Sequence, residues 1–274
     1  MKIVTLIENT PGIPGCCCEH GLSLYIETER HRILADTGAS GIFLKNARML
    51  GIDLRKIDLV VVSHGHYDHA GGVLDFARMN PEAKIYIHRQ AGGRFFHLKE
   101  TGEKYIGIEP EILTLPQCCL TEGEVALDEE VSLFSEIGGR KLWPEGNLEL
   151  KREVNGKYIQ DNFEHEQCLV ISRESRKILI SGCAHNGILN ILDRYEEIYH
   201  GRPEVVISGF HMKKQTEYTQ RELDQIRKTA QLLKETGSLF YTGHCTGQRA
   251  FEEMKAVMGE QLQALHSGET VLEM

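Results

Sequence analysis

The stretch VVSHGHYDHAGG, residues 61–72, places three histidines and one aspartate within six positions, directly after a run of apolar residues. The apolar run predicts a strand that ends at Val62. Four side chains with metal-binding atoms then follow at the edge of the sheet: His64, His66, Asp68 and His69. Imidazoles two positions apart can converge on one ion, and the aspartate with the next histidine can turn toward a second. The stretch therefore predicts a metal site, and the alternative is a mononuclear site in which Asp68 acts as a base.

The composition is that of a globular protein without membrane segments. Of 274 residues, 41% are hydrophobic and 26% are charged, values close to globular averages. No apolar run approaches the roughly 18–20 residues needed to span a bilayer. The amino terminus, MKIVTLIENTPG, is typical of a first strand and not of an export signal. We therefore expect a cytoplasmic protein that does not insert into a membrane.

The net charge and the spacing of the cysteines indicate which kinds of partner and which state of the thiols to expect. A formal net charge of −9 argues against a nucleic-acid-binding surface, which needs a basic face. The eight cysteines include the consecutive run 16–18 and the adjacent pair 118–119, which is not the spacing of a disulfide framework. We expect reduced thiols and a small-molecule substrate, and the sequence leaves a homo-oligomer open.

The pattern of apolar runs and turn residues predicts a mixed α/β protein. Strands are expected at 2–8, 22–28, 31–38, 58–64, 84–88, 167–172, 177–182, 204–209 and 238–243. Helices are expected at 41–51, 186–201, 219–237 and 246–259. In the third helix, apolar residues recur every three or four positions, and Gly237 stands where a left-handed C-terminal residue belongs.

Residues 89–165 are less periodic and are punctuated by proline and glycine. Long ordered segments of this kind are often functional. We expect one domain over residues 1–274, in which 89–165 is either an irregular insertion or a cap near the active site.

The motif SHGHYDHAGG at 63–72, with ILADTG at 33–38, resembles the signature of the metallo-β-lactamase fold superfamily. The resemblance implies a four-layer αββα sandwich with a metal site, usually dinuclear, at one edge of its two sheets. Within the superfamily, EHGLSLYIE, SGCAHNGILN, SGFH and GHCTG are most similar to the dihydropterin-methyl-ribofuranosylaminobenzene phosphate synthase-like subgroup. Most sequences of that subgroup are described only as metal-dependent hydrolases.

The same resemblance implies which residues hold the metals. His64 and His66 would bind the first ion, and Asp68 with His69 the second. Where the family usually has an acidic bridging ligand, this chain has Cys183, which could still bind as a thiolate.

The remaining ligands have competing candidates. His185 is favoured over His165 for the first ion because its motif is shared with the subgroup. For the last ligand, strand order counted from Cys183 favours His211, whereas GHCTG favours His244. We expect His244 to be the ligand and His211 to face the substrate. Asp36 is expected to accept a hydrogen bond from a ligating imidazole.

These features lead us to expect a metal-dependent hydrolase that uses a metal-activated hydroxide, with Asp68 as the catalytic residue, on a small anionic substrate. Two divalent ions are expected, with zinc favoured over manganese or iron. One alternative is a metal-assisted transferase related to methanopterin-type pterin synthesis. Another is a sensor that binds metal or ligand without turnover.

Overall fold

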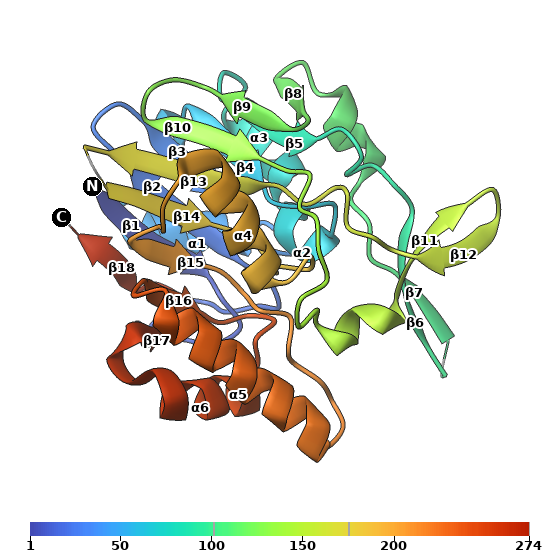
Figure 1. Ribbon diagram of the computed structural model, residues 1–274. Coiled ribbons are helices and arrows are strands. Elements are labelled where there is room, and N and C mark those ends of the chain that lie inside the picture. Colours follow the sequence, from blue (N-terminus) through green and yellow to red (C-terminus); the bar gives the residue numbers. More distant parts are fainter. Residues whose placement is uncertain (101, 175, 274) are drawn as a thin grey trace.

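The computed structural model describes residues 1–100, 102–174 and 176–273 of the chain. Its centre is a pair of seven-stranded sheets (Figure 1). The first sheet contains, in spatial order, β18 (Thr270–Glu273), β1 (Lys2–Ile7), β2 (Ser23–Glu27), β3 (Arg32–Ala35), β4 (Leu59–Val62), β5 (Lys84–His88) and β8 (Cys118–Thr121). The second contains β17 (Leu262–Ala264), β16 (Leu239–Thr242), β15 (Val205–Ile207), β14 (Arg176–Ile180), β13 (Cys168–Arg173), β10 (Val131–Phe134) and β9 (Glu124–Ala126).

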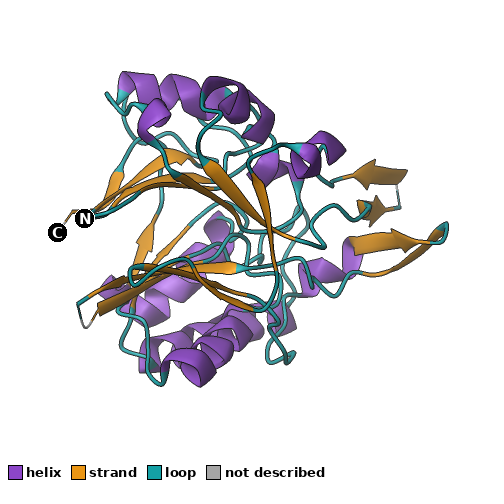
Figure 2. Cartoon of the chain, turned by 90° about the horizontal axis from the view of Figure 1, so that it is seen from above, coloured by secondary structure: helices purple, strands orange, loops and turns teal. Residues whose placement is uncertain are grey.

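Helices cover the outer face of each sheet, so the chain forms four layers (Figure 2). The first sheet packs against α1 (Ile42–Met49) and α3 (Val73–Met79), and the second against α4 (Ile188–Tyr199), α5 (Gln220–Glu235) and α6 (Gln248–Met258). A third apolar cluster fills the space between the sheets, with side chains from strands of both. The predicted αββα sandwich is therefore confirmed.

Short helical turns complete the chain: α2 (Tyr67–Ala70), η1 (Leu54–Lys56), η2 (Pro110–Thr114), η3 (Glu145–Glu149) and η4 (Gly259–Gln261). The capping of α5 is as its sequence indicates. Thr219 and Glu222 form a capping box at its start, and Gly237 has a φ of 76° just beyond its end.

Strand direction brings the ends of distant segments to one edge of the sandwich. β3, β4 and β5 run parallel in the first sheet, as do β14, β15 and β16 in the second. The carboxyl ends of parallel strands lie at the same edge, where following side chains point into a crevice and not the core. The loops after these strands therefore meet at the junction of the two sheets.

Residues 89–165 contain more regular structure than their sequence suggested. Four strands form a third, smaller sheet in the order β12 (Lys157–Gln160), β11 (Leu150–Val154), β6 (Phe95–Lys99) and β7 (Gly102–Tyr105), which extends from one side of the body (Figure 1). The segment also supplies β8 to the first main sheet and β9 and β10 to the second. It is thus woven into the sandwich, and its role as a cap stays a prediction.

All nine predicted strands and all four predicted helices are present, with ends displaced by at most three residues. The strands that the sequence did not indicate are short, of three to five residues, and two of them, β7 and β12, are exposed along their whole length. Within the described residues, no helix combines the length and apolar character that crossing a bilayer would require.

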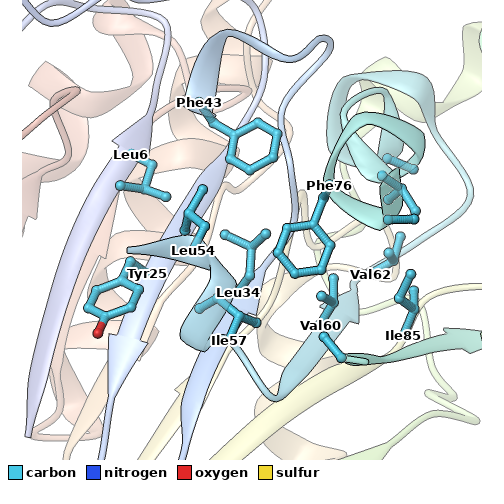
Figure 3. Packing of buried hydrophobic residues seen from close by; sticks show 14 of the residues in the cluster. Leu6, Tyr25, Leu34, Phe43, Leu54, Ile57, Val60, Val62, Phe76 and Ile85 are labelled. Carbon is cyan, nitrogen blue, oxygen red and sulfur yellow. The ribbon is translucent and has the colours of Figure 1, made fainter. Parts of the chain in front are cut away.

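The first apolar cluster fixes the helix that follows the histidine motif. Phe76 of α3 and Phe43 of α1 pack over Leu34, Val60 and neighbouring strand residues (Figure 3), and Phe76 is fully buried. This packing ties the motif to the sheet because α3 begins at Val73, directly after its last glycine.

We expect Phe76→Ala to lower the free energy of unfolding by about 3–5 kcal/mol, since the truncation leaves a cavity in a close-packed layer. Leu120→Ala is a suitable control, because Leu120 is 57% exposed, and its cost should stay below about 1 kcal/mol. Equilibrium unfolding in urea measures both. Similar losses for the two variants would contradict the packing described.

Candidate metal centre

The loop after β4 folds tightly against the loop after β3. A Cβ atom on Gly71 would lie 2.2 Å from the Ala39 carbonyl oxygen, and one on Gly72 would lie 2.5 Å from the Phe43 ring. No larger residue fits at either position without moving the backbone. The short helix α2 therefore holds Asp68 and His69 in fixed orientations at the edge of the sandwich.

Asp36 orients two of the histidines. Its carboxylate accepts a hydrogen bond of 2.6 Å from Nδ1 of His69 and one of 2.8 Å from the Ser63 hydroxyl. Because the Ser63 proton is used in this way, its oxygen accepts from Nδ1 of His64, at 2.9 Å. In both rings the proton is held on Nδ1, so the lone pair lies on Nε2. The role predicted for Asp36 toward a site imidazole matches this geometry.

Two asparagines orient, in the same way, the histidines that follow strands of the second sheet. Nδ1 of His185 donates to Oδ1 of Asn147 at 2.9 Å, and Nδ1 of His244 donates to Oδ1 of Asn9 at 2.9 Å. The orientation of each amide is fixed because its Nδ2 donates to the main-chain oxygen of the same histidine. These two rings also present Nε2 as a lone pair.

The lone pairs meet in two clusters that share one thiol. The first donor group consists of His64, Cys183 and His185, and the second donor group of His69, Cys183 and His244. In each group the donor atoms lie within 4.8 Å of one another, and every residue is buried. Cys183 thus stands at the junction of the two groups, where the sequence pattern of the family has its bridging ligand.

The site meets the requirements for binding a divalent metal. Within the described part of the chain, Nε2 of His64, His66 and His185 is buried without a hydrogen-bond partner, a costly state for a polar atom unless an ion is bound. Nε2 of His69 and of His244 lie 3.2 Å apart. Nitrogen ligands at about 2.0–2.1 Å from one tetrahedral ion would be separated by roughly 3.4 Å.

Asp68 adds a carboxylate to the second donor group. Its Oδ2 lies 3.3 Å from Nε2 of His244. Burial opposes ionisation of this carboxyl, but the surrounding histidines, with His244 foremost, hold the pKa of Asp68 well below its ordinary value. Burial likewise tends to lower the pKa of His69, yet the Asp36 carboxylate raises that pKa to about 9. In the absence of a metal, a proton can therefore occupy the space between the second group's nitrogens.

Burial is the main influence on the pKa values of His64, His66 and His185. It lowers the pKa of His66 to about 3, and it lowers the pKa values of His64 and His185 well below the ordinary value. These rings are neutral at physiological pH, which is the form that binds a metal.

His211 lies on the side of the site formed by His185. The two rings are 4.3 Å apart, and Nδ1 of His211 is buried without a partner among the described residues. The backbone N–H of His211 donates to the sulfur of Cys245, which belongs with Cys183 and His211 to a further cluster of donor atoms. His211 is thus separate from the second donor group, which contains His244.

His165, the alternative to His185, uses both ring nitrogens in the fold. Its Nδ1 accepts from the backbone N–H of Gly65, and its Nε2 donates to Asp161 at 3.1 Å. The ring therefore supports the loop between His64 and His66. His185, in contrast, has a free Nε2 that is turned toward the other donors.

Several residues of the site had not been expected from the sequence. Nε2 of His20 lies 3.3 Å from Oδ2 of Asp68. Burial, followed by His244, lowers the pKa of His20 to about 4. The other unexpected residues are Glu8, Asn9, Asn147 and Glu166. The histidine in EHG was the only local signal for any of them.

Comparisons with known proteins agree with this geometry. The model of the metallo-beta-lactamase superfamily matches residues 18–216. The chain is 30% identical to the 7,8-dihydropterin-6-methyl-4-(beta-D-ribofuranosyl)-aminobenzene-5'-phosphate synthase of Methanocaldococcus jannaschii, over 99% of this chain and 96% of the relative.

Solved structures give the same result. The crystal structure of Tm1679, described as a metal-dependent hydrolase of the beta-lactamase superfamily, superposes with a TM-score of 0.85 at 32% identity, covering 100% of this chain and 99% of the other. The metallo-beta-lactamase fold protein YhfI from Bacillus subtilis shares the fold, with a TM-score of 0.56 at 12% identity and 99% of each chain covered. The chain therefore belongs to the metallo-β-lactamase superfamily, as the histidine motif predicted.

Proposed function

We propose that this protein is a hydrolase with two divalent metal ions, and that its substrate is a small anionic molecule. His64, His66 and His185 would hold the first ion, and Asp68, His69 and His244 the second. The observation that carries the proposal is the convergence of donor atoms in two adjoining buried groups, together with the buried and unpartnered Nε2 atoms of His64, His66 and His185. Cys183, whose sulfur lies in both groups, would contact both ions.

Zinc is the favoured metal. The donor set combines imidazoles, one carboxylate and one thiol, and a thiolate ligand shifts the preference toward zinc and away from manganese. When bound, a pair of such ions lowers the pKa of a shared water and polarises a carbonyl or phosphoryl oxygen.

Asp68 is the residue we assign to proton transfer. Its carboxyl is held ionised by the surrounding histidines, so Oδ2 can accept a proton from the attacking water. Asp36 keeps His69 in the tautomer that leaves Nε2 available. His20 and His211 lie at the edges of the two donor groups, and we assign them to contact with the substrate.

An anionic substrate is favoured by the positive charge of Lys213 near His20. His20 is half-exposed, and Lys213 lies close enough to contribute to its lowered pKa, after burial and His244. His64 and His185 are neutral, so an ion bound between them would be the dominant positive charge there.

A metal-assisted transferase is the second candidate. Its support is the 30% identity, over nearly the full length, to a relative named for a pterin-linked synthase reaction. The same two metal positions would then activate a phosphorylated pterin precursor for attack by an aminobenzene. A non-catalytic sensor is a third candidate that the donor geometry accommodates equally, since metal binding alone does not require turnover.

We expect the metal-free protein to be inactive and addition of zinc or manganese to restore hydrolysis of one class within a panel of phosphodiesters, thioesters and lactones. Metal content and rates are measured on the same samples. Protein that carries two ions per chain and remains inert across the panel would contradict the hydrolase proposal.

The transferase candidate makes a different prediction. Incubation of the metal-loaded protein with a pterin pyrophosphate and an aminobenzene partner should give a coupled product and free pyrophosphate, which mass spectrometry separates from simple hydrolysis. A coupled product without hydrolysis on the panel would replace the first candidate by the second. Retained metal and bound ligand without either reaction would point to a sensor.

Asp36→Asn should weaken metal binding about 10–100-fold. The amide cannot accept hydrogen bonds from the Ser63 backbone, the Ser63 hydroxyl and His69 at the same time, so one histidine loses its fixed tautomer. Asp75→Asn serves as the control because Asp75 lies on the surface, paired with Arg78. Competition with a chelator measures the metal affinity of both variants. Equal metal affinities of the two variants would refute the orienting role of Asp36.

A further inference from the structure

His185 is held at three points by two buried side chains. Its backbone N–H donates to the Glu166 carboxylate at 2.6 Å. Its ring Nδ1 donates to Oδ1 of Asn147 at 2.9 Å, and its carbonyl oxygen accepts from Nδ2 of the same asparagine at 2.7 Å. Glu166 and Asn147 are at most 1% exposed. Every polar group of His185 except Nε2 is thereby occupied.

His244 is held in the same way by a different pair. Its backbone N–H donates to the Glu8 carboxylate at 2.6 Å, its Nδ1 donates to Oδ1 of Asn9 at 2.9 Å, and its carbonyl accepts from Nδ2 of Asn9 at 3.1 Å. The backbone N–H of Gly21 also donates to Oδ1 of Asn9, which fixes the amide orientation independently. Again Nε2 is the ring atom left for a metal.

The two arrangements, which we call the Glu–Asn cradles, come from unrelated parts of the chain. Glu8 and Asn9 follow β1 and lie 236 and 235 residues from His244. Asn147 lies in η3, within the segment 89–165, and Glu166 precedes β13. The same three hydrogen bonds are thus built twice, once for a histidine of each donor group.

The Glu–Asn cradles stabilise backbone conformations that are otherwise unfavourable. His244 itself has a φ of 51°, and Ala184, directly before His185, also has a φ of 51°. Left-handed conformations at non-glycine residues cost of order 1–3 kcal/mol and persist only where the surroundings enforce them. The carboxylate on each backbone N–H supplies that constraint, and the asparagine adds the orientation of the ring.

We propose that Asn147 and Asn9 are matched positioning residues, each of which sets the affinity of one metal position. Asn147 acts on the first ion through His185, and Asn9 acts on the second through His244. The inference rests on the proposed pair of metal ions. It also gives the segment 89–165 a role in the site, through Asn147, that does not require this segment to be a cap.

The test uses the full-length chain, zinc as the probe and competition with a chelator as the readout. The wild type should bind two ions tightly. Asn147→Ala and Asn9→Ala should each retain one tight ion and bind the other about 10–100-fold more weakly. The double variant should bind both ions weakly, because the two residues act on different positions.

Controls separate orientation of a ligand from general stability. Asn80 is a buried asparagine that donates to the Ile57 and Leu54 carbonyls and to no residue of the donor groups, so Asn80→Ala should lower the unfolding midpoint in urea without changing zinc affinity. If an alanine variant fails to fold, Asn147→Leu and Asn9→Leu keep the volume and remove the hydrogen bonds.

Four results would overturn the inference. Single variants that bind both ions as tightly as the wild type would contradict the positioning role. A zinc affinity that falls as much in Asn80→Ala as in the single variants would contradict it as well. A double variant that still holds one tight ion would mean that both asparagines act on the same position. Wild-type protein that binds fewer than two ions would overturn the proposed function, and with it the inference.

Discussion

The site depends on the direction in which each buried imidazole carries its proton. His64, His69, His185 and His244 all donate from Nδ1 to a fixed acceptor, and all present Nε2 to the same space. Rings whose Nδ1 protons are held in this way direct Nε2 inward, and such an array of nitrogen donors favours a cation at its centre. If one of these acceptors were replaced by a hydrogen-bond donor, the corresponding ring would carry its proton on Nε2, which faces the other rings.

The sandwich architecture brings together the residues that orient these imidazoles. The acceptors and donors belong to loops after β1, β3, β4, β14 and β16, together with η3, and only a common edge of two sheets brings these segments together. The turns needed there are tight: Asp36, Ala184, His211 and His244 all have positive φ although none is glycine. Such strain is tolerated because the apolar clusters on both sheets and the Glu–Asn cradles over-determine the local geometry.

The sequence was sufficient for the fold, and it named residues that the structure brings into buried donor clusters, but it did not indicate the residues that orient them. The motif at 61–72 and the alternation of strands and helices predicted the sandwich. Asn9, Asn147 and Glu166 could not be predicted, because a single asparagine or glutamate has no pattern and its partner is tens to hundreds of residues away. The strands within 89–165 were missed because all are only three to five residues long, and the exposed ones, β7 and β12, lack the alternation of apolar residues that marks a half-buried strand.

The central claim is that two adjoining groups of Nε2 atoms bind two ions. Anomalous diffraction from crystals of zinc-loaded protein, recorded at the zinc edge, tests it most directly. We predict two peaks, one in contact with His64, His66 and His185, and the other with Asp68, His69 and His244. A single peak, or a peak bound by His165 and Asp161 in place of His185, would contradict the account.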